Sequence, residues 1–116
     1  MGMQEDRLER GIAYKIEGRY TEATVELEAL LAEDANYAEA QHQLGLVLGF
    51  VGQFDDSLAA LERAVALDGS NTLARNDLAL TYTMLGMYDE AKAEFARVLA
   101  QDVGNDVARR NLTYLQ

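Results

Sequence analysis

The fold is decided by residues 44–64, LGLVLGFVGQFDDSLAALERA. Gly52 lies in the middle of this stretch, and Gly18 and Gly86 stand 34 residues before and after it. A constant spacing over three copies is typical of a structural repeat. The same period relates Gly11, Gly45 and Ala79; Tyr14, Leu48 and Tyr82; Tyr20, Phe54 and Tyr88; Ala23, Ser57 and Ala91; and Leu27, Leu61 and Phe95. The chain therefore contains an internal repeat.

Each repeat is predicted to be a pair of helices, because two stretches of helical periodicity flank a break centred on Gly18, Gly52 or Gly86. The units are residues 4–37, 38–71 and 72–105, and residues 106–116 begin a fourth. Asn71 and Asn105 precede first helices, where an asparagine side chain accepts a hydrogen bond from an unpaired backbone amide. Acidic residues open the second helices, where the helix dipole favours them without any catalytic role: Glu22, Asp55, Asp56, Asp89 and Glu90.

The composition is that of one globular domain. The chain has 116 residues, of which 49% are hydrophobic, and this is enough for a single packed core. It contains no cysteine, which excludes disulfides and thiolate sites. The longest uncharged stretch, residues 40–54, is shorter than the ~20 residues that span a bilayer. Residues 1–7 include three charged side chains and lack the apolar stretch of a secretory signal. We therefore expect a cytoplasmic protein without a membrane span.

The chain is acidic, with a net charge of −10 from 20 acidic and 10 basic side chains. This charge repels phosphate backbones, so a nucleic-acid ligand is not expected. Two interpretations of the acidity stay open. It is either a solvated surface, with a source adapted to high salt as one variant, or a means of attracting a basic partner.

The repeat resembles that of the tetratricopeptide repeat (TPR) family, in which Leu-Gly and a later large residue precede a Gly-x-aromatic turn and a second series of small and large residues. The second repeat matches best, with Leu44-Gly45, Leu48, Gly52-x-Phe54, Ser57, Leu61 and Ala64. Arg10 departs from the usual Leu, and the family's late proline is absent from all three units. The resemblance implies a single all-α domain over residues 1–116, a right-handed superhelical solenoid of three TPR hairpins with a capping helix at 106–116.

The resemblance also implies a concave groove lined by the first helix of each pair. The residues at its groove positions are Leu8, Ile12, Lys15, Ile16, His42, Leu46, Gly49, Phe50, Leu73, Asn76, Leu80, Thr83 and Met84, continued by Arg110 and Tyr114 on the last helix, with Glu5, Glu39 and Val107 completing the wall. The apolar members form a strip, and an exposed apolar surface beyond ~400 Å² commonly marks an interaction site. The strip predicts binding of a helix or an extended peptide through apolar anchors. For any one residue, packing between neighbouring first helices is the alternative.

The polar groove positions narrow the function. His42 is the only histidine, and a polar groove contact or a surface position is favoured over metal binding or catalysis, because both of those need converging partners. No catalytic residue, metal or cofactor is therefore predicted. Gly49, inside a helix, either admits a close ligand backbone or is simply tolerated at a cost of about 0.5–1 kcal/mol.

TPR domains that hold chaperone tails grip a terminal carboxylate with Lys, Asn and Arg. Leu8 and Ile12 stand at the corresponding first-repeat positions and cannot donate hydrogen bonds, so such a carboxylate clamp is not expected. Lys15 and Arg110 can each meet one acidic group. We predict a protein-interaction scaffold without enzymatic activity. Its ligand is an unidentified protein or peptide, and basic residues that flank the bound segment would favour binding to the acidic surface. Self-assembly into a homo-oligomer is the alternative, and an enzyme would require an appended domain.

Overall fold

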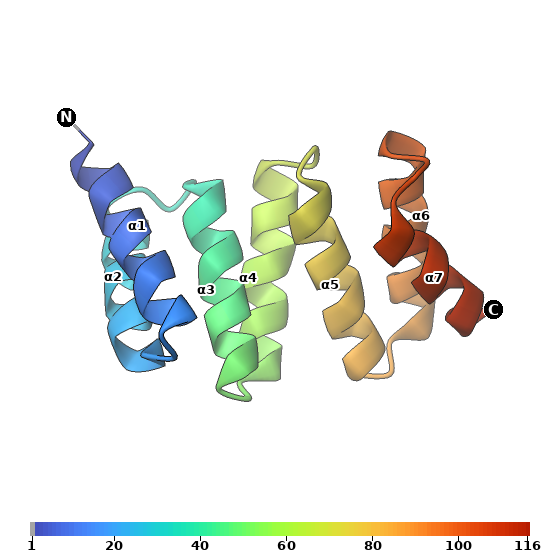
Figure 1. The fold of residues 1–116 in the computed structure, drawn as a ribbon, viewed down its shortest axis with the longest axis horizontal. Coiled ribbons are helices and arrows are strands. Elements are labelled where there is room, and N and C mark those ends of the chain that lie inside the picture. Colours follow the sequence, from blue (N-terminus) through green and yellow to red (C-terminus); the bar gives the residue numbers. More distant parts are fainter. Residues whose placement is uncertain (1) are drawn as a thin grey trace.

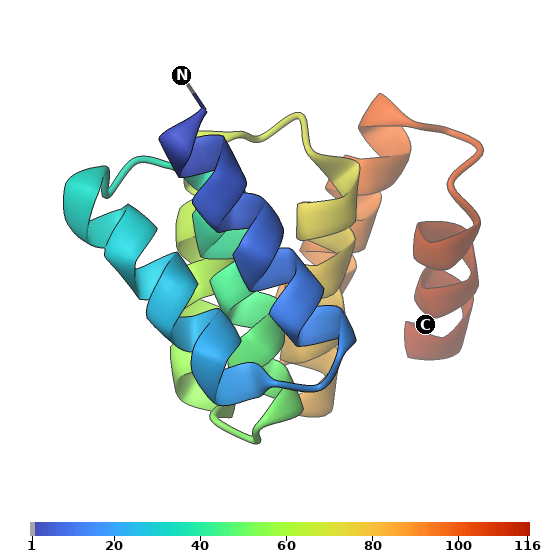
Figure 2. The same ribbon diagram turned by 60° about the vertical axis from the view of Figure 1, so that its left-hand side comes forward.

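The computed structural model describes residues 2–116, which form an all-α solenoid (Figure 1). Its helices are α1 (Met3–Ile16), α2 (Tyr20–Glu33), α3 (Ala38–Phe50), α4 (Phe54–Leu67), α5 (Thr72–Met84), α6 (Tyr88–Gln101) and α7 (Asp106–Leu115). The pairs α1–α2, α3–α4 and α5–α6 are hairpins that follow one another along the longest axis of a 44 × 28 × 22 Å body (Figures 1 and 2). The predicted all-α repeat fold is confirmed.

Helices contact mainly their neighbours in chain order. The two helices of a hairpin pack most extensively, and the second helix of each repeat packs on the first helix of the next. The first helices of successive repeats touch one another far less. Space for a ligand is therefore expected between first helices, and not between the helices of one hairpin.

The turn inside each hairpin depends on its glycine. Gly18, Gly52 and Gly86 have φ values of 78°, 83° and 77°, in the left-handed region that glycine adopts without a steric cost. The amide that follows each glycine donates to a carbonyl five residues back, as from Gln53 to Leu48 O at 2.9 Å. This is the Schellman arrangement that ends helices. The predicted breaks are confirmed.

The predicted caps are also present. The side chains of Asn71 and Asn105 accept hydrogen bonds from the amides of Ala74 and Ala108 at 3.1 and 3.0 Å. Asn36, one place earlier in its repeat, does not cap α3. Its Oδ1 instead accepts a hydrogen bond from Arg63 on α4, at 2.8 Å.

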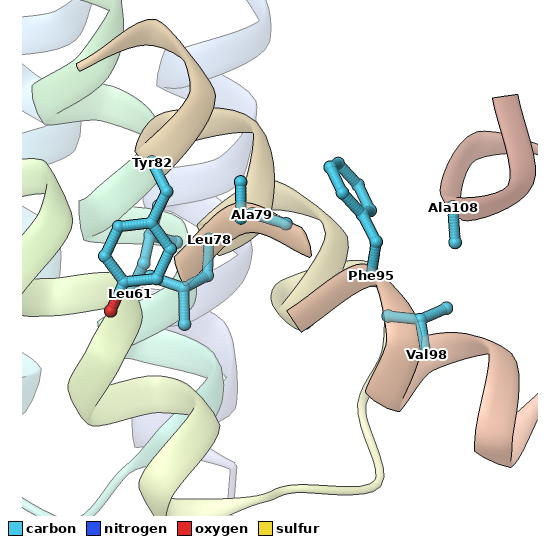
Figure 3. Packing of buried hydrophobic residues seen from close by; sticks show 8 residues of the cluster. Leu61, Leu78, Ala79, Tyr82, Phe95, Val98 and Ala108 are labelled. Carbon is cyan, nitrogen blue, oxygen red and sulfur yellow. The ribbon is translucent and has the colours of Figure 1, made fainter. Parts of the chain in front are cut away.

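Two apolar clusters form the core, because each helix buries one face against both neighbours in the stack. The first joins repeats one and two through Ala23, Leu27, Leu30, Ala40, Leu44 and Val47. The second joins α4, α5, α6 and α7 through Leu61, Leu78, Ala79, Tyr82, Ala91, Phe95, Val98 and Ala108 (Figure 3). The residues that recur in the sequence at small and large positions supply much of both clusters.

The buried phenol of Tyr82 should make the stability of the fold depend on pH in the alkaline range. Burial first, and then the hydrogen bond to Glu62 and the charge of that carboxylate, raise the pKa of Tyr82 above its ordinary value of 10.0. The unfolded chain ionises this phenol at a lower pH than the folded one, so its contribution to stability is complete below the ordinary pKa and declines as the pH rises above it. We expect the free energy of unfolding to fall more steeply above that pH for the wild type than for Tyr82→Phe. Urea denaturation at a series of pH values checks this, and parallel curves for the two proteins would contradict it.

Candidate functional site

A pocket of about 270 Å³ opens between the first helices of repeats two and three. We call it the α3–α5 pocket. On α3 the helical spacing of Leu46, Gly49 and Phe50 brings these residues to the side that faces α5. On α5 the same spacing aligns Leu80 and Met84 toward α3. The complete lining is Gly45, Leu46, Gly49, Phe50, Ser57, Leu61, Asp77, Leu80, Thr81 and Met84.

The pocket has a closed and an open end. At the closed end the lining consists of buried side chains, Ser57 and Leu61 of α4. Phe50 and Met84, the last residues of α3 and α5, are 59% and 63% exposed. Ile16, the last residue of α1, is exposed as well and continues this apolar row by one repeat. The row supplies anchoring surface next to the pocket.

The ring of Phe50 packs against an aromatic side chain of the first repeat. Its ring centroid lies 5.5 Å from that of Tyr20, at the start of α2, with the rings tilted by 37°. This separation and tilt are in the range that aromatic pairs prefer. Phe50 is therefore oriented although much of its surface is open to solvent.

His42 corrects the expectation from sequence. Its side chain is not a groove contact or a surface residue, because it is only 5% exposed. Nε2 lies 2.8 Å from Oδ2 of Asp77 on α5, and Nδ1 lies 3.9 Å from Oε1 of Glu39. The imidazole therefore joins repeats two and three beside the pocket. Its side chain is enclosed by the protein and is not available to a ligand.

Asn76 also departs from the expected groove position. It is buried, and its Nδ2 donates to Oδ1 of Asn105, the cap of α7, at 3.0 Å. His42 and Asn76 occupy the same position in successive repeats. His42 bonds Asp77 on the first helix of the next repeat, and Asn76 bonds Asn105, which caps the helix that follows the third repeat. This position fastens the repeats together, because a buried polar group is stable only when it is hydrogen-bonded.

Lys15 and Arg110 lie apart from the pocket. Lys15 is half-buried and donates from Nζ to Oε1 of Gln43 at 2.5 Å, so it fastens α1 to α3. Arg110 is exposed, and its Nε donates to the carbonyl of Asp106 at 3.4 Å. The sequence placed both in the groove, and neither lines the α3–α5 pocket.

The remaining predicted residues are distributed along the stack. Leu8 packs against the first core cluster, and Ile12 is half-buried. Leu73 and Tyr114 are exposed, and the hydroxyl of Thr83 is bonded to the carbonyl of Ala79. Of the predicted residues, the structure thus brings together Leu46, Gly49, Phe50, Leu80 and Met84 in one pocket. The sequence analysis missed Asp77, which lies outside the positions that the family resemblance assigns to the groove.

A second recess is larger but polar. It has a volume of about 700 Å³ and lies between the start of α1 and the segment that leads into α3. Glu5, Asp34 and Glu39 contribute carboxylates to it. Across residues 2–116 no cluster of three or more His, Asp or Glu side chains is placed to hold a metal ion, and no helix there is long and apolar enough to cross a membrane.

Comparison with known proteins identifies the family. Residues 51–112 match the model of the tetratricopeptide repeat, so the chain belongs to the TPR family. No curated protein sequence matches the chain.

Solved structures share the fold along nearly the whole chain. The first TPR domain of Spaghetti (RPAP3), bound to the HSP90 peptide SRMEEVD, is 23% identical, with a TM-score of 0.90 over 97% of this chain and 89% of that one. MamA is 24% identical, with a TM-score of 0.91 over 98% of this chain and 67% of that one. The TPR domain of Arabidopsis OM64 is 19% identical, with a TM-score of 0.91 over 100% of this chain and 96% of that one.

Proposed function

We propose that this TPR domain is a protein-interaction scaffold without catalytic activity of its own, which binds a peptide or helix through apolar anchors in its concave groove. The observation that carries the proposal is the α3–α5 pocket, whose walls are apolar and whose rim holds the exposed side chains of Phe50 and Met84. A volume of about 270 Å³ lies below the ~300–1,000 Å³ of pockets for drug-sized ligands. It suits one anchoring side chain of a longer chain.

Structural relatives support peptide binding in general, whereas the residues of this chain favour a ligand that differs from theirs. The RPAP3 domain binds a peptide that contains two glutamates and an aspartate, SRMEEVD. In this chain the α3–α5 pocket has the carboxylate of Asp77 and no lysine or arginine in its lining, and the first-repeat positions carry Leu8 and Ile12. We therefore propose a ligand without a clamped terminal carboxylate. The cytoplasm remains the predicted location.

Selection from a random peptide library tests the proposal. We expect peptides enriched on the wild type to bind Leu46→Lys, Leu80→Lys at least about tenfold more weakly, because two charged side chains in an apolar pocket must lose water when the anchor of a peptide enters. Isothermal titration calorimetry measures the affinities. Equal affinity for the wild type and a folded variant would defeat the concave-site proposal.

Two further variants control for folding and for charge. Leu80 also packs against the core, whereas Phe50→Lys, Met84→Lys alters only two exposed side chains and should retain the fold. Val25→Lys, Val103→Lys adds the same charge at exposed apolar positions outside the pocket and should bind as the wild type does. Light scattering over a range of concentrations shows whether a second copy occupies the groove instead, since the mass would then rise with concentration.

A further inference from the structure

The α3–α5 pocket combines an apolar wall with one negative charge. Asp77 precedes Leu80 and Thr81 by one helical turn and Met84 by two, so α5 carries the carboxylate and the apolar side chains along a single stripe. The carboxylate is partly exposed, and its Oδ2 is fixed 2.8 Å from Nε2 of the buried His42. The charge is therefore held in a defined place on the lining.

No permanent cation balances this charge inside the protein. Within residues 2–116, no lysine or arginine lines the pocket or pairs with Asp77. Lys15, the one lysine predicted for the groove, is bonded to Gln43. A carboxylate offers about four acceptor sites, and the imidazole of His42 occupies one of them. Asp77 thus retains acceptor capacity at the pocket.

We propose that the α3–α5 pocket takes a lysine or arginine side chain of the bound peptide, an inference that rests on the proposed function above. The aliphatic stem packs against Leu46, Leu80 and Met84, and the cationic end pairs with the Asp77 carboxylate. The exposed aromatic ring of Phe50 favours a cation further. His42 positions Asp77 and does not itself contact the ligand.

Charge decides between this occupant and a purely apolar one. An apolar anchor fits the walls, but it covers the carboxylate without pairing it, and removing water from an unpaired charge opposes binding. A basic side chain satisfies both the walls and the charge. The net charge of −10 also attracts a cationic segment during encounter.

Parallel selection from a random peptide library on the wild type and on Asp77→Asn tests this inference. Asparagine keeps an oxygen that accepts the hydrogen bond from His42, so the substitution removes the charge with little change in shape. We expect lysine or arginine to be enriched at a fixed position in peptides selected on the wild type, and not in those selected on Asp77→Asn. Circular dichroism checks that both proteins have the same helical content.

The probe for affinity is the arginine-containing peptide most enriched on the wild type, compared with the same peptide in which citrulline replaces that arginine. Citrulline keeps the shape of the side chain without its charge. We expect a loss of about tenfold on the wild type, typical of a charged hydrogen bond, and almost no difference on Asp77→Asn. Val25→Lys, Val103→Lys, which leaves the pocket unchanged, should show the wild-type difference.

The outcomes separate this inference from the proposed function. Enriched peptides that lack a basic residue, or that bind equally with arginine and citrulline, overturn the cation pocket and leave the scaffold in place. Failure of any peptide to bind the wild type more tightly than Phe50→Lys, Met84→Lys overturns the proposed function as well. The comparison of arginine with citrulline on the wild type decides the matter even if Asp77→Asn does not fold.

Discussion

Replacing Phe95 by alanine should lower the free energy of unfolding by about 3–5 kcal/mol. The ring is 0% exposed and lies in the second core cluster, where it meets residues of α5, α6 and α7 (Figure 3). Its removal takes away buried apolar area and leaves a cavity that the surrounding helices fill only in part. Urea denaturation followed by circular dichroism measures the loss.

Phe50→Ala is the matched control, because Phe50 has the same side chain but is 59% exposed. We expect it to cost less than about 1 kcal/mol, since surface substitutions seldom cost more. Hydrogen exchange adds spatial detail. Stability in a repeat protein is a sum of units and their interfaces, so α5, α6 and α7 should lose protection before α1 and α2 in Phe95→Ala. Equal losses of stability in the two variants would show that Phe95 is not a core residue.

Gly45→Ala should destabilise the fold by about 1–3 kcal/mol, even though alanine favours a helix more than glycine does. A Cβ atom on Gly45 would lie 2.7 Å from Cγ and 2.8 Å from Cδ2 of Leu61, a buried side chain of α4. Leu61 is buried in the second core cluster, so a shift of its side chain disturbs the packing around it. The glycine is thus required for the close approach of α3 and α4.

Gly49→Ala is the control for this substitution, one helical turn further along α3. A Cβ atom on Gly49 would have Oγ of Ser57 as its nearest neighbour, at 3.4 Å, which is an ordinary contact. The gain in helix propensity should therefore stabilise the fold by about 0.5–1 kcal/mol. The two substitutions are chemically identical, and urea denaturation should give them opposite signs. Two stabilising results would mean that α3 and α4 are not in close contact at Gly45.

The repeat and its turns could be predicted from local chemistry. Gly18, Gly52 and Gly86 each end a helix because glycine enters the left-handed region freely. Asn71 and Asn105 cap helices because their side chains bond amides three residues ahead. These effects act over a few residues, so the sequence contains all the information they need.

Part of the α3–α5 pocket could be predicted for a related reason. Leu46, Phe50, Leu80 and Met84 were assigned to the groove by their position in the repeat, and the structure gathers them at one pocket. Position in a repeat fixes the side of the helix on which a residue lies. It does not fix what stands opposite, and so the burial of His42 and Asn76 was missed.

The sequence by itself determined the helices and their pairing into hairpins, because periodicity, turn glycines and caps are local properties. Only the tertiary structure decided which side chains of different helices meet. It pairs Arg75 with Glu94 at 2.6 Å and His42 with Asp77 at 2.8 Å, and the second pair holds the Asp77 carboxylate in the lining of the α3–α5 pocket. The physical reason is that these pairs are 19 and 35 residues apart in the sequence and come together only through the packing of helices. Interactions between residues that are close in the sequence do not determine such contacts.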